Sequence, residues 1–254
     1  MNIQKLLLSF LFLGILGSNC FGQITPPGLG KVNTASWMAI GIKQALDSAK
    51  QVSSITYIGM GRTSSPTNDN PFKRGSIFVI NQEVSNHFTE HWKYAFALSY
   101  RWQNLFNDNS TTGDHHVTQG RQEFRFYGQL SYLKSISRLK YAVTYRPEMR
   151  LFYLPDFRPY SERIQFRSRL KAKMSIDLNE ASTKRLISSA EVLFSSGKHD
   201  KWEKFEYKDT RLCLYYAFSP PNSKLNFNIG YMYDLIGKSF DSDTHYLAFD
   251  IIFG

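Results

Sequence analysis

Arginine and glutamate recur, mostly at every second position, along three successive stretches of this 254-residue chain. The candidate lumen-lining residues are Arg121, Glu123, Arg125, Arg146, Glu148, Arg150, Arg163, Arg167 and Arg169. Side chains of opposite charge on neighbouring strands stabilise strand pairing, so this set could form a lattice of ion pairs. Rings of arginine can instead attract anions into a pore. Basic residues outnumber acids in the set, so not every charge can be paired within it. We favour the structural lattice.

The spacing of these charges predicts strands. From Arg163 to Lys173 every odd position carries a charged or amide side chain, and every even position is apolar or small. A period of two indicates an extended strand with two unlike faces. Strands of soluble proteins average about 5–6 residues, whereas a tilted strand that crosses a bilayer needs about 9–11. We therefore expect the charged face to line a lumen and the apolar face to meet lipid.

The same pattern predicts an all-β fold, an antiparallel transmembrane β-barrel of about twelve strands (10–12). Eleven extended segments can be identified between turn-forming clusters, over 34–45, 52–62, 76–88, 92–106, 120–134, 139–153, 162–177, 184–196, 207–219, 224–237 and 244–254. Long and short connections alternate between them, as in outer-membrane barrels, whose C-terminus then lies at the periplasmic rim. Such barrels usually have an even strand number. Either a strand is hidden within 24–33, or this N-terminal segment threads through the lumen.

Residues 1–22 have the features of a cleaved signal peptide: Lys5, an apolar core from Leu6 to Leu16, and a small-residue exit before Gln23. A lipid-modified Cys20 is the rival interpretation, disfavoured because Asn19 precedes it. The predicted organisation is a signal peptide over 1–22, an N-terminal segment over 23–33 and a barrel over 34–254. Cleavage would leave Cys213 alone, so no intramolecular disulfide can form.

Catalytic and metal sites are not expected. A nucleophilic mechanism needs a Ser or Thr within hydrogen-bond reach of a His that a third group orients. His245 lies near Ser242 and Asp243, but their spacing matches no known barrel phospholipase, and the pleat points His245 toward lipid. His115 and His116 could bind a metal with Asp114, but adjacent side chains on an extended chain point in opposite directions. We predict no catalytic residue, no metal and no cofactor.

The formal net charge of +10 argues little for nucleic acid, because the cations alternate along strands and do not form a surface stripe. The expected partners are outer-membrane lipid and the barrel-assembly machinery, with no nucleic acid. The oligomeric state cannot be inferred from these patterns.

Several short motifs resemble a known family. They are Trp37–Gln44, Tyr57–Arg62, Gln122–Gly128, Leu154–Phe157, Ile229–Met232 and His245–Asp250. Together they resemble domain-of-unknown-function family 2490, an uncharacterised bacterial family, over nearly all of the chain after residue 22. The resemblance implies an outer-membrane barrel in a Gram-negative bacterium, and places the family's polar strand positions at the nine candidate lumen-lining residues. It implies no activity.

We therefore expect a non-enzymatic outer-membrane β-barrel with a structural role or a narrow, anion-preferring, porin-like pore. The alternatives are an outer-membrane lipid-modifying enzyme and a soluble periplasmic β-barrel that binds a ligand. A lipid enzyme needs its His and nucleophile together on the lipid-facing wall, whereas the polar groups here concentrate on the predicted inner face.

Overall fold

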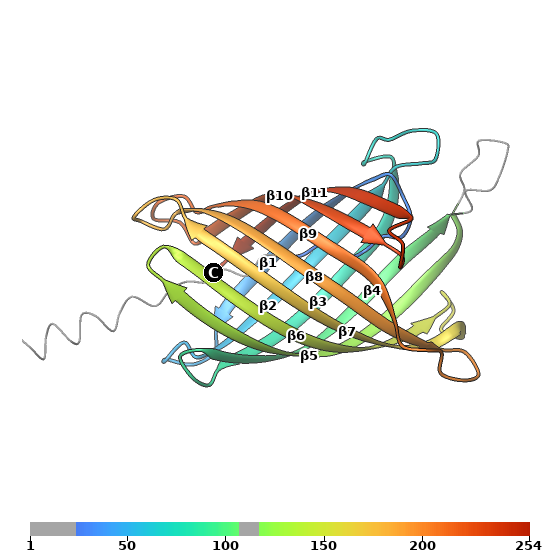
Figure 1. Ribbon diagram of the computed structural model, residues 1–254, viewed down its shortest axis with the longest axis horizontal. Coiled ribbons are helices and arrows are strands. Elements are labelled where there is room, and N and C mark those ends of the chain that lie inside the picture. Colours follow the sequence, from blue (N-terminus) through green and yellow to red (C-terminus); the bar gives the residue numbers. More distant parts are fainter. Residues whose placement is uncertain (1–23, 107–116) are drawn as a thin grey trace, which may run out of the picture.

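Eleven strands close into one barrel in the computed structural model, which describes residues 24–106 and 117–254 (Figure 1). The strands are β1 (Thr34–Ala45), β2 (Val52–Thr63), β3 (Arg74–His87), β4 (Trp92–Phe106), β5 (Val117–Ile136), β6 (Leu139–Tyr153), β7 (Pro159–Asp177), β8 (Lys184–Lys198), β9 (Glu206–Phe218), β10 (Leu225–Ile236) and β11 (Ser242–Phe253). In the described part of the chain, no helix is long and apolar enough to cross a membrane. The predicted signal peptide and the pair His115–His116 lie outside the described residues.

The all-β barrel is confirmed, and each of the eleven predicted segments overlaps one strand. Eleven strands lie within the expected range of 10–12. The expectation of wholly antiparallel pairing is wrong, because β1 and β11 pair in parallel, with Thr34 opposite His245 and Ile42 opposite Phe253. An odd number of antiparallel strands leaves the first and last pointing the same way, so only a parallel pair can close this barrel.

The N-terminal segment 24–33 is not a strand but lies inside the barrel. Ile24 lies beside Gly41, the β1 residue that pairs with Ile252 near the end of β11. Further along, the Thr244 hydroxyl at the start of β11 donates to the carbonyl of Val32 at 2.6 Å. The segment therefore runs the length of the lumen, opposite in direction to β11, before β1 begins. This path accounts for the odd strand number.

The two ends of the barrel differ in their connections. One end, here called the loop end, carries 64–73, 154–158, 199–205 and 237–241. The other, the turn end, carries 46–51, 88–91, 137–138, 178–183 and 219–224, together with the C-terminus (Figure 1). The alternation in length is weaker than expected, since 219–224 is longer than 237–241. The strands β7 and β11 begin earlier than predicted and shorten the connections before them.

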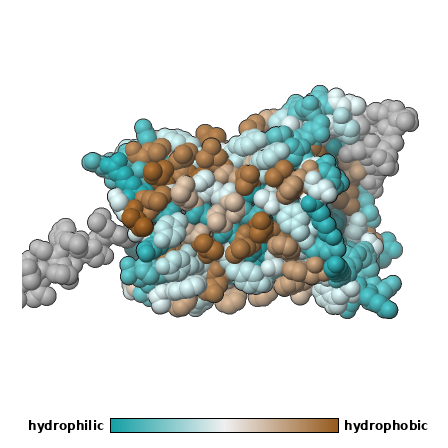
Figure 2. Space-filling view, viewed as in Figure 1, coloured by the Kyte–Doolittle hydropathy of each residue, from teal (hydrophilic) through white to brown (hydrophobic). Residues whose placement is uncertain are grey.

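Each strand has an inner and an outer face. Every strand places at least one large apolar side chain on the outside, namely Ile40, Ile58, Ile80, Leu98, Phe126, Tyr145, Leu170, Leu186, Leu214, Ile229 and Leu247. On the face in Figure 2, apolar and neutral residues cover the middle of the wall, and hydrophilic residues gather toward both ends. The neighbours of these apolar residues along each strand point inward.

Candidate functional site: the lumen of the barrel

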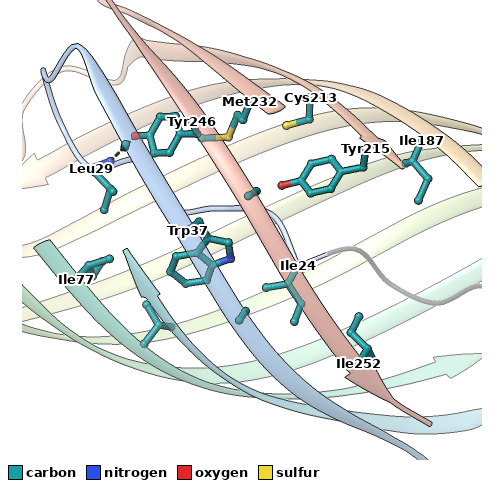
Figure 3. Packing of buried hydrophobic residues seen from close by; sticks show 14 of the residues in the cluster. Ile24, Leu29, Trp37, Ile77, Ile187, Cys213, Tyr215, Met232, Tyr246 and Ile252 are labelled. Atoms are coloured by element: carbon teal, nitrogen blue, oxygen red, sulfur yellow. Dashed lines mark hydrogen bonds between the residues drawn. The ribbon is translucent and has the colours of Figure 1, made fainter. Parts of the chain in front are cut away.

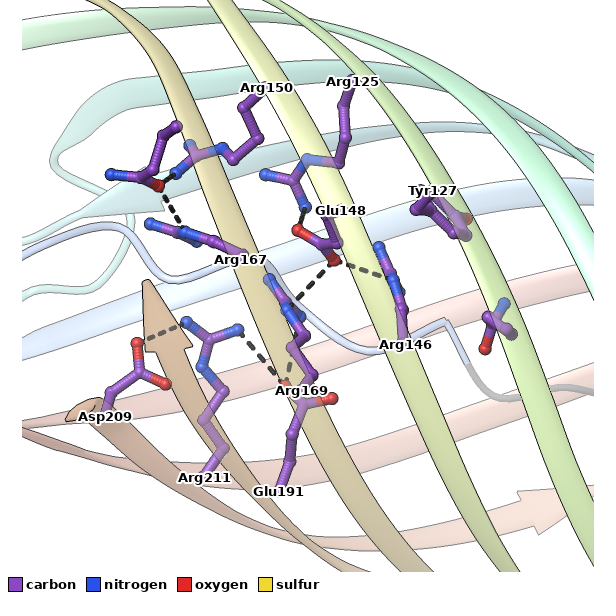
Figure 4. A network of polar contacts seen from close by, with 12 residues as sticks. Arg125, Tyr127, Arg146, Glu148, Arg150, Arg167, Arg169, Glu191, Asp209 and Arg211 are labelled. Carbon is purple, nitrogen blue, oxygen red and sulfur yellow. Dashed lines mark hydrogen bonds and ion pairs between the residues drawn. The ribbon is translucent and has the colours of Figure 1, made fainter. Parts of the chain in front are cut away.

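A continuous network of ion pairs crosses six strands, from β5 to β10, on the inner wall (Figure 4). We call it the charge lattice. Its members are Glu123, Arg125, Arg146, Glu148, Arg150, Arg169, Glu191, Asp209, Arg211 and Asp234. Because every second residue of a strand points inward, neighbouring strands bring these groups into adjacent rows.

Glu148 on β6 is the centre of the charge lattice. Its Oε1 lies 2.7 Å from Nε of Arg146 and 3.1 Å from Nε of Arg169. Its Oε2 lies 3.1 Å from Nη1 of Arg125. The side chain of Glu148 is 0% exposed. One fully buried carboxylate therefore compensates three guanidinium groups that come from three strands.

Glu123 on β5 forms the second node. Arg150 donates to it through Nε at 2.8 Å and Nη2 at 2.5 Å, which is the paired geometry that guanidinium and carboxylate favour. Arg125 Nη2 lies 2.7 Å from Oε1 of the same carboxylate. Arg125 thus links Glu123 to Glu148 and makes the two nodes one network.

Four of the ten members of the charge lattice were not among the predicted residues. Glu191 on β8 lies 3.1 Å from Arg169 and 3.7 Å from Arg211 on β9, and Arg211 also contacts Asp209 and Asp234. These residues bring the charge lattice to five acids and five arginines. A signal for them exists in the sequence, because Asp209 and Arg211 share the spacing of two that marked β5 and β6.

Three of the predicted residues lie outside the charge lattice. Arg121 donates to Oε1 of Gln103 at 2.6 Å and stacks over the ring of Phe152. Arg167 donates through Nε to Oε1 of Gln165 at 2.6 Å. Arg163 is exposed at the loop end, where the pairing of β6 with β7 is irregular. The amide side chains of Gln103 and Gln165 occupy places where a carboxylate would form an ion pair.

The opposite side of the lumen is apolar (Figure 3). Ile24 and Leu29 of the N-terminal segment are buried in a cluster with residues of β1, β3 and β8 to β11, including Trp37, Ile77, Ile187, Tyr215, Met232, Tyr246 and Ile252. The amide of Leu29 donates to the hydroxyl of Tyr246 at 2.9 Å. Side-chain packing and a few backbone hydrogen bonds thus hold the segment in place.

Two glycines make this packing possible. A Cβ atom at Gly28 would meet the guanidinium of Arg211, with the carboxylate of Asp234 3.3 Å away. A Cβ at Gly59 would overlap the indole of Trp37. Gly28 therefore lets the N-terminal segment pass directly against the charge lattice, and Gly59 lets the indole lie flat on β2.

The residues of the predicted hydrolytic alternative are separated by the pleat. His245 lies on the outer wall, with Nδ1 2.5 Å from the Tyr231 hydroxyl and Nε2 3.8 Å from Asp243. Tyr233 also donates to Asp243 at 2.7 Å. Ser242 is three residues away on the same strand, so its side chain points to the opposite face. Within the described residues no serine or threonine hydroxyl bonds to His245.

The motif Leu154–Phe157 forms the tight connection between β6 and β7 at the loop end. Phe157 adopts φ 63, and its amide donates to the carbonyl of Leu154 at 3.0 Å. The backbone N–H and guanidinium of Arg158 donate to Asp156 and lower the pKa of its carboxyl. Gln122 donates to the carbonyls of Leu154 and Pro155 and fixes the connection to β5.

These features define a closed eleven-stranded β-barrel with a charge lattice on one inner wall and its own N-terminal segment against the other. The family model described as protein of unknown function DUF2490 matches residues 110–244, and the chain belongs to this family. The matched region contains the whole charge lattice. The motifs Trp37–Gln44 and Tyr57–Arg62, and the outer-wall His245, lie outside it. No curated protein matches the chain.

Proposed function

We propose that this protein is a non-enzymatic outer-membrane β-barrel with a closed lumen. The observation that carries the proposal is the outer wall, on which every strand exposes large apolar side chains. Soluble monomers rarely expose contiguous apolar patches larger than a few hundred Å². A band of outward apolar residues around the whole circumference is typical of barrels in lipid. A soluble periplasmic barrel would leave this band in water.

The path of the chain supports the same location. In outer-membrane barrels the longer connections are extracellular and the turns periplasmic. With that orientation, both the C-terminus and the entry point of the segment 24–33 lie on the periplasmic side. An exported chain would reach this side first. The signal-peptide features of residues 1–22 agree with this route.

The filled lumen supports a structural role over an open pore. A barrel of about eight strands is just filled by side chains, and wider barrels leave space. Eleven strands need additional filling, and here the N-terminal segment supplies it, packed between the apolar wall and Arg211. We infer that the closed form passes no ions.

A narrow anion-preferring pore is the second candidate. It is favoured by the inner arginines Arg121 and Arg167, which are bonded to amides and not to carboxylates. Cationic linings select anions. This function requires the N-terminal segment to leave the lumen, so it belongs to a second state of the barrel.

A lipid-modifying enzyme is disfavoured by the surroundings of His245. The partners of this residue in the described structure are Tyr231 and Asp243. A hydrolytic mechanism needs a nucleophile that the histidine can deprotonate, and Ser242 points to the other face. Phospholipid hydrolysis that is lost in His245→Ala would overturn the non-enzymatic assignment.

Fractionation and electrical recording test the proposal together. We expect the folded protein in the outer-membrane fraction, with a gel mobility that changes on heating. In planar bilayers we expect purified protein to insert without steady conductance. Recovery of folded protein in the soluble periplasmic fraction would refute the membrane assignment. Steady anion-selective conductance of the wild-type protein would refute the closed lumen and favour the anion-selective pore.

A further inference from the structure

A cavity of about 220 Å³ lies inside the barrel at the turn end. Its wall is built from strand ends that flank the connections 46–51, 88–91, 137–138 and 178–183, and it includes Lys43, His87, Lys93, Leu133 and Lys173. Residues 24–27 of the N-terminal segment complete the wall. We call this space the turn-end cavity. It lies on the turn-end side of the charge lattice, whose Arg146, Arg169 and Glu191 also line it.

Cations dominate the wall of the turn-end cavity. Seven lysines and arginines line it, namely Lys43, Lys93, Arg101, Arg146, Arg169, Lys171 and Lys173, against two acids, Glu83 and Glu191. Both acids are already engaged. Glu83 accepts hydrogen bonds from Tyr127 at 3.1 Å and from Gln129 at 2.6 Å. Glu191 is bound by Arg169 and Arg211. The wall therefore keeps a positive excess, although Arg146 and Arg169 also share the carboxylate of Glu148, which is not part of the wall.

Arg101 is a buried cation of this wall that forms no ion pair with a carboxylate in the described structure. It is 8% exposed, lines the turn-end cavity, and its Nε has no hydrogen-bond partner. Its direct cross-strand neighbour is Glu123, but that carboxylate binds Arg125 and Arg150. Among the described residues, no carboxylate lies within ion-pair distance of Arg101. Burial of an unpaired charge costs free energy. A bound anion next to this guanidinium would reduce that cost.

Two lysines nearer the rim extend the positive surface. Lys93 on β4 and Lys173 on β7 are half-buried, and within the described part of the chain neither has a carboxylate at ion-pair distance. Lys171 differs, because its Nζ donates to the hydroxyl of Thr25 at 2.7 Å. Lys171 thus fixes the N-terminal segment as one wall, while Arg101, Lys93 and Lys173 remain available to a ligand.

We propose that the turn-end cavity binds a small organic anion that carries a phosphate or carboxylate group. The anionic group would lie against Arg101, with Lys93 and Lys173 beside the path from the rim. The body of the ligand would contact Ile24, Ile55 and Tyr57, which form an apolar part of the wall. The inference goes beyond the closed barrel and is independent of its membrane location.

The size of the turn-end cavity limits the ligand. A water molecule occupies about 30 Å³ of the liquid, and pockets for drug-sized ligands measure about 300–1,000 Å³. A space of about 220 Å³ fits a compact molecule such as a three-carbon phosphate ester. Tyr57 also lines the turn-end cavity, and its hydroxyl could donate a hydrogen bond to such a group.

Calorimetric titration of the purified, folded full-length protein in neutral detergent tests the proposal. The probes are inorganic phosphate, glycerol 3-phosphate and uncharged glycerol. We expect saturable binding of glycerol 3-phosphate, weaker binding of phosphate and none of glycerol. Arg101→Gln should weaken binding about tenfold or more, the loss expected for a charge-assisted hydrogen bond. Lys93→Gln and Lys173→Gln should weaken it several-fold, because they flank the entry path.

Lys184→Gln is the matched control, since Lys184 is exposed at the start of β8 and outside the turn-end cavity. Its affinity should equal that of the wild type. Thermal unfolding gives a second readout, because a ligand that binds only the folded state raises the unfolding temperature. Glycerol 3-phosphate should stabilise the wild-type protein and not Arg101→Gln. Without ligand, Arg101→Gln should be at least as stable as the wild type.

Equal affinity of Arg101→Gln and wild type would overturn the proposal, and so would binding of glycerol as tight as that of its phosphate. Absence of binding for both anionic probes would also overturn it. A loss of stability in unliganded Arg101→Gln would assign Arg101 a purely structural role. These results are separate from those of fractionation and conductance, so the ligand site and the closed outer-membrane barrel can fail independently.

Discussion

The two inner walls of this barrel are filled in opposite ways. The wall from β5 to β10 carries the charge lattice, in which each buried carboxylate is shared between two or more arginines or closes the end of the network. The other wall, to which residues of β1, β3 and β8 to β11 contribute, is mainly apolar and holds the N-terminal segment by packing. Both walls belong to one continuous sheet with the same alternation. The lumen therefore differs in chemistry from one side to the other without any change of fold.

The two walls should respond differently to damage. Removal of one partner from a buried ion pair leaves an uncompensated charge and costs about 3–5 kcal/mol. Loss of an apolar side chain costs the transfer free energy plus a cavity term that depends on how far the neighbours relax. Substitutions at Glu123 or Glu148 of the charged wall should thus cause a large loss of stability. In the apolar wall the loss should scale with the side-chain volume removed.

Glu148→Ala should have the largest effect on stability. The substitution leaves Arg125, Arg146 and Arg169 without their shared carboxylate. We expect the free energy of unfolding to fall by at least about 3–5 kcal/mol, the cost of breaking one buried pair. Denaturant titration followed by gel mobility would measure the change.

Glu180→Ala is the control for that experiment. Its carboxylate pairs with Arg138 at 3.5 Å, but both side chains are exposed, at 93% and 54%. Exposed pairs contribute little, so this variant should unfold like the wild type. If Glu148→Ala also unfolded like the wild type, the charge lattice would not stabilise the barrel. Altered conductance at unchanged stability would favour the pore.

Trp37→Ala should have the next largest effect, and it tests the apolar wall. The indole of Trp37 is 1% exposed and lies over Gly59. We expect a loss of about 3 kcal/mol in the free energy of unfolding, at the lower end for tryptophan truncation, because neighbouring side chains can relax into part of the space. Trp202→Ala, which truncates a half-exposed indole in the connection 199–205, should change stability little. Equal losses in the two variants would contradict a packed apolar wall.

The sequence predicted which side chains face the lumen better than it predicted their ion-pair partners. A period of two assigns each residue of a strand to one face, so the inward position of Glu123, Arg125 and Glu148 follows from spacing alone. Ion-pair partners depend on the register between strands, which no spacing within one strand determines. Arg167 illustrates this. It pairs in register with Glu148, yet its guanidinium binds Gln165 while Glu148 binds Arg169.

The place of the N-terminal segment could not be predicted for a related reason. Residues 24–33 include Pro26, Pro27, Gly28 and Gly30, so they show no periodicity that would assign them a face. Their place in the lumen depends on contacts with residues more than 200 positions away, such as Tyr246 and Thr244. The two alternatives for this segment could be stated from the sequence, but only the tertiary contacts distinguish them.

Gly28→Leu should disturb both the N-terminal segment on the apolar wall and the end of the charge lattice. A side chain at this position would meet Arg211 and Asp234, so either the segment or the end of the charge lattice must move. We expect a loss of about 1–3 kcal/mol, typical of overpacking, and intermittent anion-selective conductance in bilayers as the segment leaves the lumen. Gly75→Ala is the control, since the nearest atom to its Cβ would be 4.0 Å away. A closed, fully stable Gly28→Leu barrel would show that the segment does not need this close approach.

Tyr246→Phe should have the smallest effect, and it separates hydrogen bonding from packing in the apolar wall. The ring of Tyr246 is fully buried, and its hydroxyl accepts a hydrogen bond from the backbone N–H of Leu29 at 2.9 Å. The substitution keeps the ring and leaves this buried N–H without a partner, which costs about 1–3 kcal/mol. We expect a value near the lower limit, because the segment can shift toward the space of the lost hydroxyl.

Hydrogen exchange of the Leu29 amide should accelerate, while amides of the charged wall, such as that of Glu148, should keep their protection. Tyr216→Phe, which alters an exposed ring on the outer wall, should change neither quantity. Faster exchange across the charged wall as well would mean that the two walls unfold as one unit, and the contrast between them would then be one of composition and not of stability.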